Sequence, residues 1–213
     1  MFREGVLRPE KYLSLLVEKL QKLKKLFLNK KYSNDSICKS LTNYFKNEKI
    51  VFIYDETANS SEGLTKGGYN IDTNEIILKC DSGLNFILKD VYDIFETDFY
   101  EMVGHELIHR LQYLNSTKNT FKKYNTLDEK QILFYLSDKK EIMSYAWQTI
   151  EIFKMLRLNK KVILQIIKNP EAKENNYFVI RNDIFFLYRK YFDSNSVIYK
   201  LFVKYIYMYL DEK

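Results

Sequence analysis

Cysteine, proline and glycine are scarce in this chain of 213 residues, and each shortage excludes a class of protein. The two cysteines, Cys38 and Cys80, are too few for a disulfide framework or a sulfur-ligated zinc site, so we interpret them as reduced thiols in the core. Two prolines and six glycines are too few for a disordered or loop-dominated chain. Because 46% of the residues are hydrophobic, we expect a folded protein with a full apolar core.

Long apolar runs are also missing. The most apolar segment, 197–210, is interrupted by Lys200 and Lys204, so we expect no membrane span. Residues 1–9 carry charges and lack the apolar stretch of a signal peptide. Together with the reduced cysteines, these features predict a cytoplasmic protein.

The excess of positive charge is modest, with a formal net charge of +6 and a pI of about 9.0. The lysines are spread along the chain and form no patch. A bias toward Lys, Asn, Ile and Tyr is also what an AT-rich genome produces. We therefore expect no specific nucleic-acid partner.

The apolar spacing predicts an α+β fold that is mostly helical. Helices are expected over 9–28, 34–46, 99–114, 138–158, 160–168, 182–191 and 196–210. Strands are expected at 50–54, 67–71 and 75–79, with the last two joined as a hairpin. This small sheet, expected to be antiparallel, should pack against the helix that begins near Phe99, capped by Asp98 and Glu101, and against the helix that begins near Asp138.

We expect the whole chain, 1–213, to form one domain. Its parts are N-terminal helices over 1–48, the sheet with the site helices over 49–158, and a helical extension over 159–213. The first helix carries an apolar seam at spacings of three and four: Leu13, Leu16, Leu20, Leu23 and Phe27. We favour packing of this seam inside the domain, and the alternative is an interface with a protein partner or a second copy.

Histidine occurs only twice, and both copies stand in one motif, His105-Glu106-Leu107-Ile108-His109. On a helix, positions i and i+4 lie one above the other, so both imidazoles can bind one metal ion. Glu106 lies about 100° round the helix from His105. It can take a proton from a water on that metal. The alternative is a surface helix with two ordinary histidines.

No third histidine exists to complete a metal site, so the remaining ligand must be a carboxylate, a cysteine or a tyrosine. We favour Glu141, near the start of a later helix. Its alternative role is to close a capping box with Asp138. The other residues able to serve as ligands are Asp128, Glu129, Asp138, Glu151 and Cys80.

Glu141 is the first residue of the segment Glu141-Ile142-Met143-Ser144-Tyr145-Ala146. With this segment and the H-E-x-x-H motif, the chain resembles the gluzincin class of metallopeptidases. In that class a glutamate from a later helix joins the two histidines. The resemblance covers residues 67–148. Within this class, the chain is similar to compact, intracellular zincins of phage and phage-derived genomes. It implies a host cytoplasm or a virion as the location, and an edge strand at 75–78 to which a polypeptide substrate adds as a further strand.

The chain departs from this family in two ways. The zincins with a third histidine are excluded by the histidine count, and Tyr145 stands where thermolysin-like members carry an acidic residue. Tyr145 can hydrogen-bond an oxyanion or orient a ligand, and its alternative is an ordinary core tyrosine.

Two functions of different classes follow. The first is a zinc-dependent endopeptidase in which His105, His109 and Glu141 bind Zn²⁺ and Glu106 is the general base. The second is a structural or interaction protein on a zincin scaffold, such as a virion or complex subunit, with little or no turnover. The intact Glu106 favours the enzyme, because a purely structural zinc site does not need a base.

Overall fold

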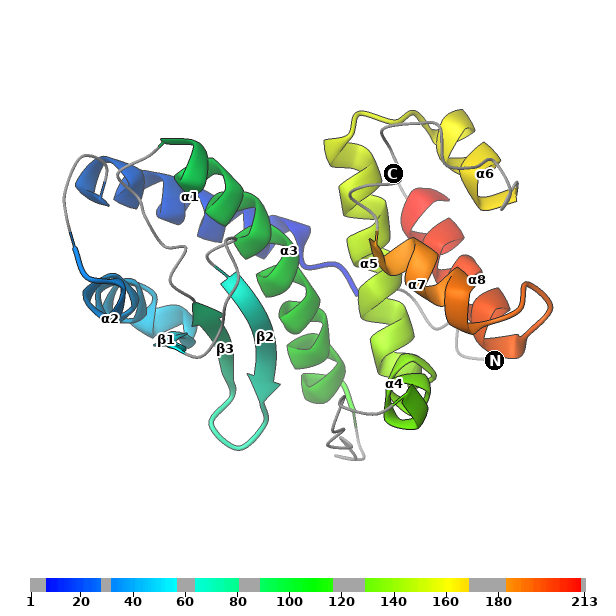
Figure 1. The fold of residues 1–213 in the computed structure, drawn as a ribbon, viewed down its shortest axis with the longest axis horizontal. Coiled ribbons are helices and arrows are strands. Elements are labelled where there is room, and N and C mark those ends of the chain that lie inside the picture. The colour runs from blue at the N-terminus through cyan, green and yellow to red at the C-terminus, as the bar shows by residue number, and fades with distance from the viewer. Residues whose placement is uncertain are drawn as a thin grey trace. The chain divides into compact units, whose positions relative to one another are not determined.

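The computed structural model describes residues 7–27, 32–56, 64–80, 89–116, 129–168 and 183–211. They are mostly helical with one small sheet, which confirms the predicted α+β class (Figure 1). The chain divides into two compact units, an N-terminal unit of Arg8–Asn115 and a C-terminal unit of Ser116–Lys213 with Met1–Leu7. This division differs from the three segments expected from the sequence, and the single domain stays a prediction.

The N-terminal unit holds the sheet and the histidine helix. Its elements are α1 (Glu10–Phe27), α2 (Asn34–Tyr44), the short 3-10 helix η1 (Lys46–Glu48), β1 (Ile50–Tyr54), β2 (Leu64–Asn70), β3 (Glu75–Cys80) and α3 (Lys89–Leu114). Ser33 caps α2 as its side chain accepts a hydrogen bond from the Ser36 N–H. The predicted strands and the first two helices are therefore present, with ends shifted by a few residues.

β3 is the central strand of the sheet, with β1 parallel to it on one side and β2 antiparallel on the other. The sheet is therefore mixed, and the expectations of an all-antiparallel sheet and of an edge strand at 75–78 were wrong. The hairpin signal correctly pairs β2 with β3. It carries no information about β1, which joins β3 on the side that the hairpin leaves open.

The outer edge of β1 is covered by α2 and the residue that follows it. Thr42 Oγ1 accepts a hydrogen bond from the Phe52 N–H at 2.8 Å and donates to the Phe52 carbonyl at 3.2 Å. The Ile50 N–H donates to the Phe45 carbonyl at 3.4 Å. These bonds satisfy the outward N–H of Ile50 and both outward backbone groups of Phe52. β2 forms the other edge of the sheet.

α3 begins at Lys89, ten residues before the expected start, so the predicted cap at Asp98 lies inside the helix. The reason is an apolar stripe that continues backward from the histidines through Phe99 and Phe95, both fully buried. The Phe99 ring lies 5.4 Å from that of Phe45 and stacks at 6.1 Å on that of Phe52. Burial of two aromatic side chains outweighs the weak local signal of a capping box.

The apolar seam of α1 is part of this core. All five residues of the seam are at most 5% exposed, and α1 runs beside α3 (Figure 1). The favoured interpretation, packing inside its own unit, is confirmed for these residues.

The C-terminal unit is helical. Its elements are α4 (Glu129–Leu136), α5 (Lys139–Met155), α6 (Lys160–Lys168), α7 (Asp183–Tyr191) and α8 (Val197–Asp211). α5 packs against α8, with Trp147 and Phe202 fully buried. The Tyr188 ring stacks on that of Phe202 at 4.0 Å. α4 was not expected from the sequence. α8 buries Phe202, Tyr205 and Tyr209 within the unit.

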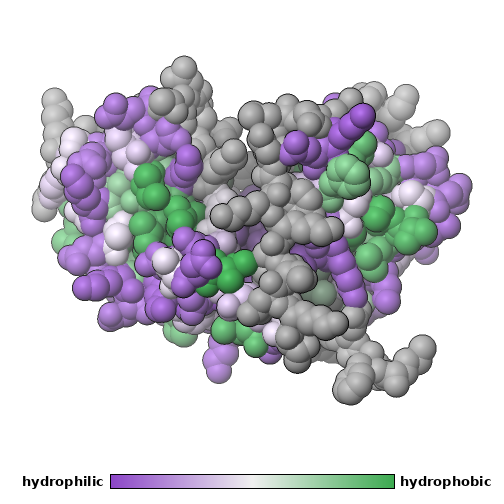
Figure 2. All heavy atoms as spheres, turned by 90° about the horizontal axis from the view of Figure 1, so that it is seen from below, coloured by the Kyte–Doolittle hydropathy of each residue, from purple (hydrophilic) through white to green (hydrophobic). Residues whose placement is uncertain are grey.

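Within the described ranges, no helix combines the length and the apolar character needed to cross a bilayer. On the face shown in Figure 2, hydrophilic residues predominate and hydrophobic ones gather in small groups.

Candidate metal centre

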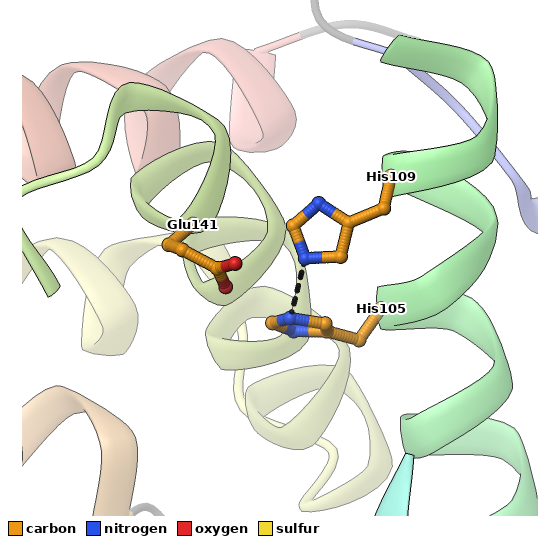
Figure 3. A group of neighbouring side chains, drawn as sticks. All are labelled: His105, His109 and Glu141. Carbon is orange, nitrogen blue, oxygen red and sulfur yellow. Dashed lines mark hydrogen bonds between the residues drawn. The ribbon is translucent and has the colours of Figure 1, made fainter. Parts of the chain in front are cut away.

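The two histidines lie on successive turns of α3, and their rings meet edge to face with centroids 4.8 Å apart (Figure 3). Each is only 6% exposed, and the two Nε2 atoms are 3.0 Å apart. At this distance one nitrogen donates a hydrogen and the other accepts it. The same two nitrogens can instead direct lone pairs at one cation, which is the geometry that the i, i+4 spacing predicts.

Glu106 lies on α3, and its side chain is buried against the edge strand β2. It is 7% exposed, and a Cβ added to Gly67 on β2 would stand 3.1 Å from Glu106 Oε1. Because Gly67 has no side chain, the Glu106 carboxylate has room to lie against β2. Gly67 connects the predicted general base to β2, which the sequence did not reveal because the two residues are far apart in the chain.

The outer edge of β2 presents outward-facing backbone groups next to this carboxylate. Ile76 and Leu78 direct their backbone groups toward β1, as the bond from the Ile76 N–H to the Lys49 carbonyl at 2.9 Å shows. Gly67 and Tyr69 lie opposite Leu78 and Ile76 in the register. Because hydrogen-bonded and non-bonded pairs alternate in an antiparallel ladder, Gly67 and Tyr69 turn their N–H and C=O groups outward.

Glu141 lies in the first turn of α5, in the C-terminal unit. Asp138 caps this helix, since its Oδ1 accepts from the Lys140 N–H at 2.9 Å. The Asp138 N–H donates to the Tyr135 carbonyl at 3.0 Å, so the bond that a capping box would give to Glu141 is taken. The carboxylate of Glu141 instead accepts a hydrogen bond from the Tyr135 hydroxyl.

Tyr135 links Glu141 to Tyr145. The Tyr135 and Tyr145 hydroxyls are 3.0 Å apart, and the Tyr145 ring packs edge-on against that of Tyr188. Burial raises the pKa of Tyr135 far above its usual value, and the neighbouring Tyr145 and Glu141 raise it further. Tyr135 thus stays protonated and donates to the Glu141 carboxylate. The role of Tyr145 stays a prediction.

Tyr135 was missed because no sequence signal points to it. It lies on α4, six positions before Glu141, and reaches the carboxylate across the turn between two helices. Helical spacing rules apply only within one helix. Gln112 was also missed, although its distance of one turn from His109 on α3 is a usable signal: His109 Nδ1 lies 3.0 Å from Gln112 Oε1.

The other candidate ligands are engaged elsewhere or lie outside the description. Asp138 caps α5, and Glu151 forms an ion pair with Lys154 at 2.5 Å. Cys80 is fully buried at the end of β3. Asp128 and the side chain of Glu129 lie outside the described residues. Glu141 therefore remains the best candidate for a third ligand.

The two imidazoles and the Glu141 carboxylate supply a group of ligand atoms that could hold a metal ion (Figure 3). No model of a known family matches the sequence, and comparisons with curated proteins and with solved structures also find no match.

Proposed function

We propose that this chain is a zinc-dependent endopeptidase, with His105, His109 and Glu141 as the metal ligands. The observation that carries the proposal is the pair of buried Nε2 atoms 3.0 Å apart on the helix that also bears the buried Glu106. Spacing of this kind brings two neutral nitrogen donors to one point. A structural histidine pair would not need a buried carboxylate beside it.

The donor set fits zinc better than the common hard cations. Calcium and magnesium sites in proteins are built from oxygen ligands, and magnesium retains several waters. Two imidazoles with one carboxylate are a typical catalytic zinc set that leaves one position open. When bound, zinc supplies Lewis-acid activation of a water and of the scissile carbonyl.

Glu106 performs the proton transfers in this proposal. It takes a proton from the water that attacks the peptide carbonyl carbon, and it later delivers that proton to the leaving nitrogen as the C–N bond breaks. Its burial beside Gly67 holds the carboxylate at the edge of the sheet. Tyr135 orients Glu141 through the hydroxyl hydrogen bond, in the way that outer partners orient metal ligands.

The substrate binds as an extended strand along β2 in this proposal. The outward N–H and C=O groups of Gly67 and Tyr69 can pair with the main chain of a peptide, which recognises polypeptides without regard to sequence. The place differs from the one expected from the sequence, since 75–78 is paired on both sides. β2 also stands directly beside Glu106, so the bound strand passes the base.

The test combines metal analysis with a search for cleavage. The purified protein is dialysed without added metal, its zinc content is measured, and it is incubated with a peptide library of mixed sequence. We expect one zinc per chain and cleavage that a chelator abolishes and zinc restores. Absence of zinc that reconstitution does not reverse would overturn the metal site. Bound zinc without any turnover would support an interaction protein on the same scaffold.

A further inference from the structure

The second histidine of the motif has a partner that the proposed chemistry does not yet use. His109 Nδ1 lies 3.0 Å from the side-chain oxygen of Gln112, one turn later on α3. His109 is buried and Gln112 is half-buried, so water competes little for this bond. A carbonyl oxygen can only accept a hydrogen bond, so the ring nitrogen that faces it carries the hydrogen.

This bond determines which nitrogen of His109 is available for a metal. A neutral imidazole carries one hydrogen, so a hydrogen on Nδ1 leaves the lone pair on Nε2. Nε2 is the atom that lies 3.0 Å from His105 Nε2. In the metal-free protein His105 therefore donates from Nε2 and His109 accepts. For both Nε2 atoms to bind one metal, the hydrogen of His105 moves from Nε2 to Nδ1, whereas His109 already has its Nε2 lone pair available.

We propose that Gln112 is a positioning residue that holds His109 in the Nδ1–H tautomer and so makes Nε2 the metal-binding nitrogen. The metal-binding consequence rests on the proposed function, whereas the tautomer itself does not. The bond also fixes the orientation of the His109 ring, because it holds Nδ1 at Gln112 and so directs Nε2 toward His105. Losing such an outer partner typically weakens metal binding by about 10- to 100-fold.

The experiment measures the tautomer and the zinc affinity separately. The ¹⁵N chemical shifts of His109 are recorded in the metal-free protein at a pH where both imidazoles are neutral. Zinc affinity is measured by competition with a chromophoric chelator. The variants are Gln112→Met, which keeps the length but removes the acceptor, and Gln112→Glu, which keeps an acceptor oxygen. Gln21→Met is the matched control, since Gln21 bonds Glu96 on the surface of the same unit.

We expect the wild type, Gln112→Glu and Gln21→Met to show the Nδ1–H tautomer and similar zinc affinity. Gln112→Met should shift His109 toward the Nε2–H tautomer and bind zinc about 10- to 100-fold more weakly, with an unchanged circular dichroism spectrum. An Nε2–H tautomer in the wild type, or a His109 tautomer that Gln112→Met leaves unchanged, would overturn the proposal. If the wild type binds no zinc, the proposed function fails, while the ¹⁵N shifts still decide the role of Gln112.

Discussion

Two carboxylates of the candidate centre stand in different surroundings, and these surroundings suit different tasks. Glu106 lies against a glycine of the edge strand. Glu141 accepts a hydrogen bond from the Tyr135 hydroxyl and lies in the first turn of α5, which Asp138 caps. A carboxylate that is held by a donor suits a fixed ligand, whereas one beside an open strand edge suits proton transfer.

Replacing Glu106 tests its role as the base. Glu106→Gln keeps the size and polarity of the side chain but cannot accept the proton, so we expect zinc content and thermal stability near those of the wild type. Peptide hydrolysis should fall by at least about 100-fold, the usual scale for a lost general base. Equal hydrolysis by the variant and the wild type would exclude Glu106 from the mechanism.

Replacing Glu141 distinguishes a ligand from a helix cap. Glu141→Ala should weaken zinc binding by more than the roughly 10- to 100-fold effect of losing an outer partner. The matched control is Asp138→Ala in the same turn, which removes the observed cap. It should cost about 1 kcal/mol of stability and leave zinc affinity unchanged. Zinc titrations and urea unfolding of both variants measure the two effects. If Glu141→Ala binds zinc as tightly as the wild type, another residue is the third ligand.

The parts of the site that were predictable from the sequence are those encoded within one helix. His105, Glu106 and His109 were identified because a spacing of four on a helix fixes which side chains meet. Glu141 was inferred by elimination, and its contact with Tyr135 was not predictable, because that contact depends on how two helices meet at a turn. Gly67 was not recognised beside Glu106, because long-range strand placement has no local signal.

At the scale of elements, β2 is the strand that connects the sheet to α3. Its outward backbone groups and its glycine beside Glu106 give it two functions in the proposed mechanism. The pair Gly67 and Gly68 allows these functions to be examined with the same substitution at adjacent positions. A Cβ at Gly68 would point into open space.

Gly67→Ala should impair turnover while Gly68→Ala should not. The new Cβ at position 67 stands 3.1 Å from Glu106 Oε1, closer than a comfortable contact, so the carboxylate must move. A displaced catalytic group reduces the rate, and we expect a loss of about 10-fold in kcat with zinc content unchanged. Steady-state kinetics with one cleavable peptide provide the measurement. Similar kcat values for the two variants would contradict the contact between β2 and the base.

The tyrosines between α4, α5 and α7 predict a stability that falls at alkaline pH. Burial raises the pKa of Tyr135 and of Tyr188 above the usual value. In the unfolded chain each ionises near pH 10, so the stabilisation is fully present below about pH 10 and is lost as pH rises further. Tyr135→Phe should make this decline shallower, whereas Tyr32→Phe, at a residue 45% exposed, should not.

Urea unfolding of the zinc-free protein between about pH 8 and 11 measures this decline. Zinc-free samples are needed because metal binding has its own pH dependence. An identical decline in the wild type and in Tyr135→Phe would mean that the Tyr135 hydroxyl ionises as easily in the folded as in the unfolded protein.

Helices and strands were more predictable than their arrangement. The short apolar run of 50–54 and the hairpin pattern of 67–79 identify the strands correctly. The seam of α1 identifies its helix, because burial on one face imposes a period. The position of β3 in the middle of the sheet and the early start of α3 were not predictable. Strand order is a long-range choice, and the contacts of Phe95 with the sheet form only after folding.

At the scale of the whole molecule, the proposed zinc site makes stability depend on metal. A metal that binds only the folded protein stabilises it by mass action, by about 2.7 kcal/mol at a free concentration of 100 times Kd. For a chain of this size, that corresponds to roughly 5–10 °C in Tm.

Chelation should therefore lower the Tm of the wild type by roughly 5–10 °C, and added zinc should restore it. Differential scanning calorimetry of zinc-loaded and zinc-free protein measures the shift. Glu141→Ala should show a much smaller shift at the same zinc concentration, since its affinity is lower. A wild-type Tm that does not respond to saturating zinc would contradict a metal site in the folded protein.

The bonds from Thr42 to Phe52 also limit how copies of this chain can aggregate. They occupy the middle of the β1 edge, so within the described residues β2 is the edge that offers more of its backbone to a further strand. A fibre grows only if each copy joins one neighbour on either side. Two copies that meet through their β2 strands use the more open edge of each, which favours a pair over a fibre. The hydroxyl of Thr42 thus works against growth from the β1 side of the sheet.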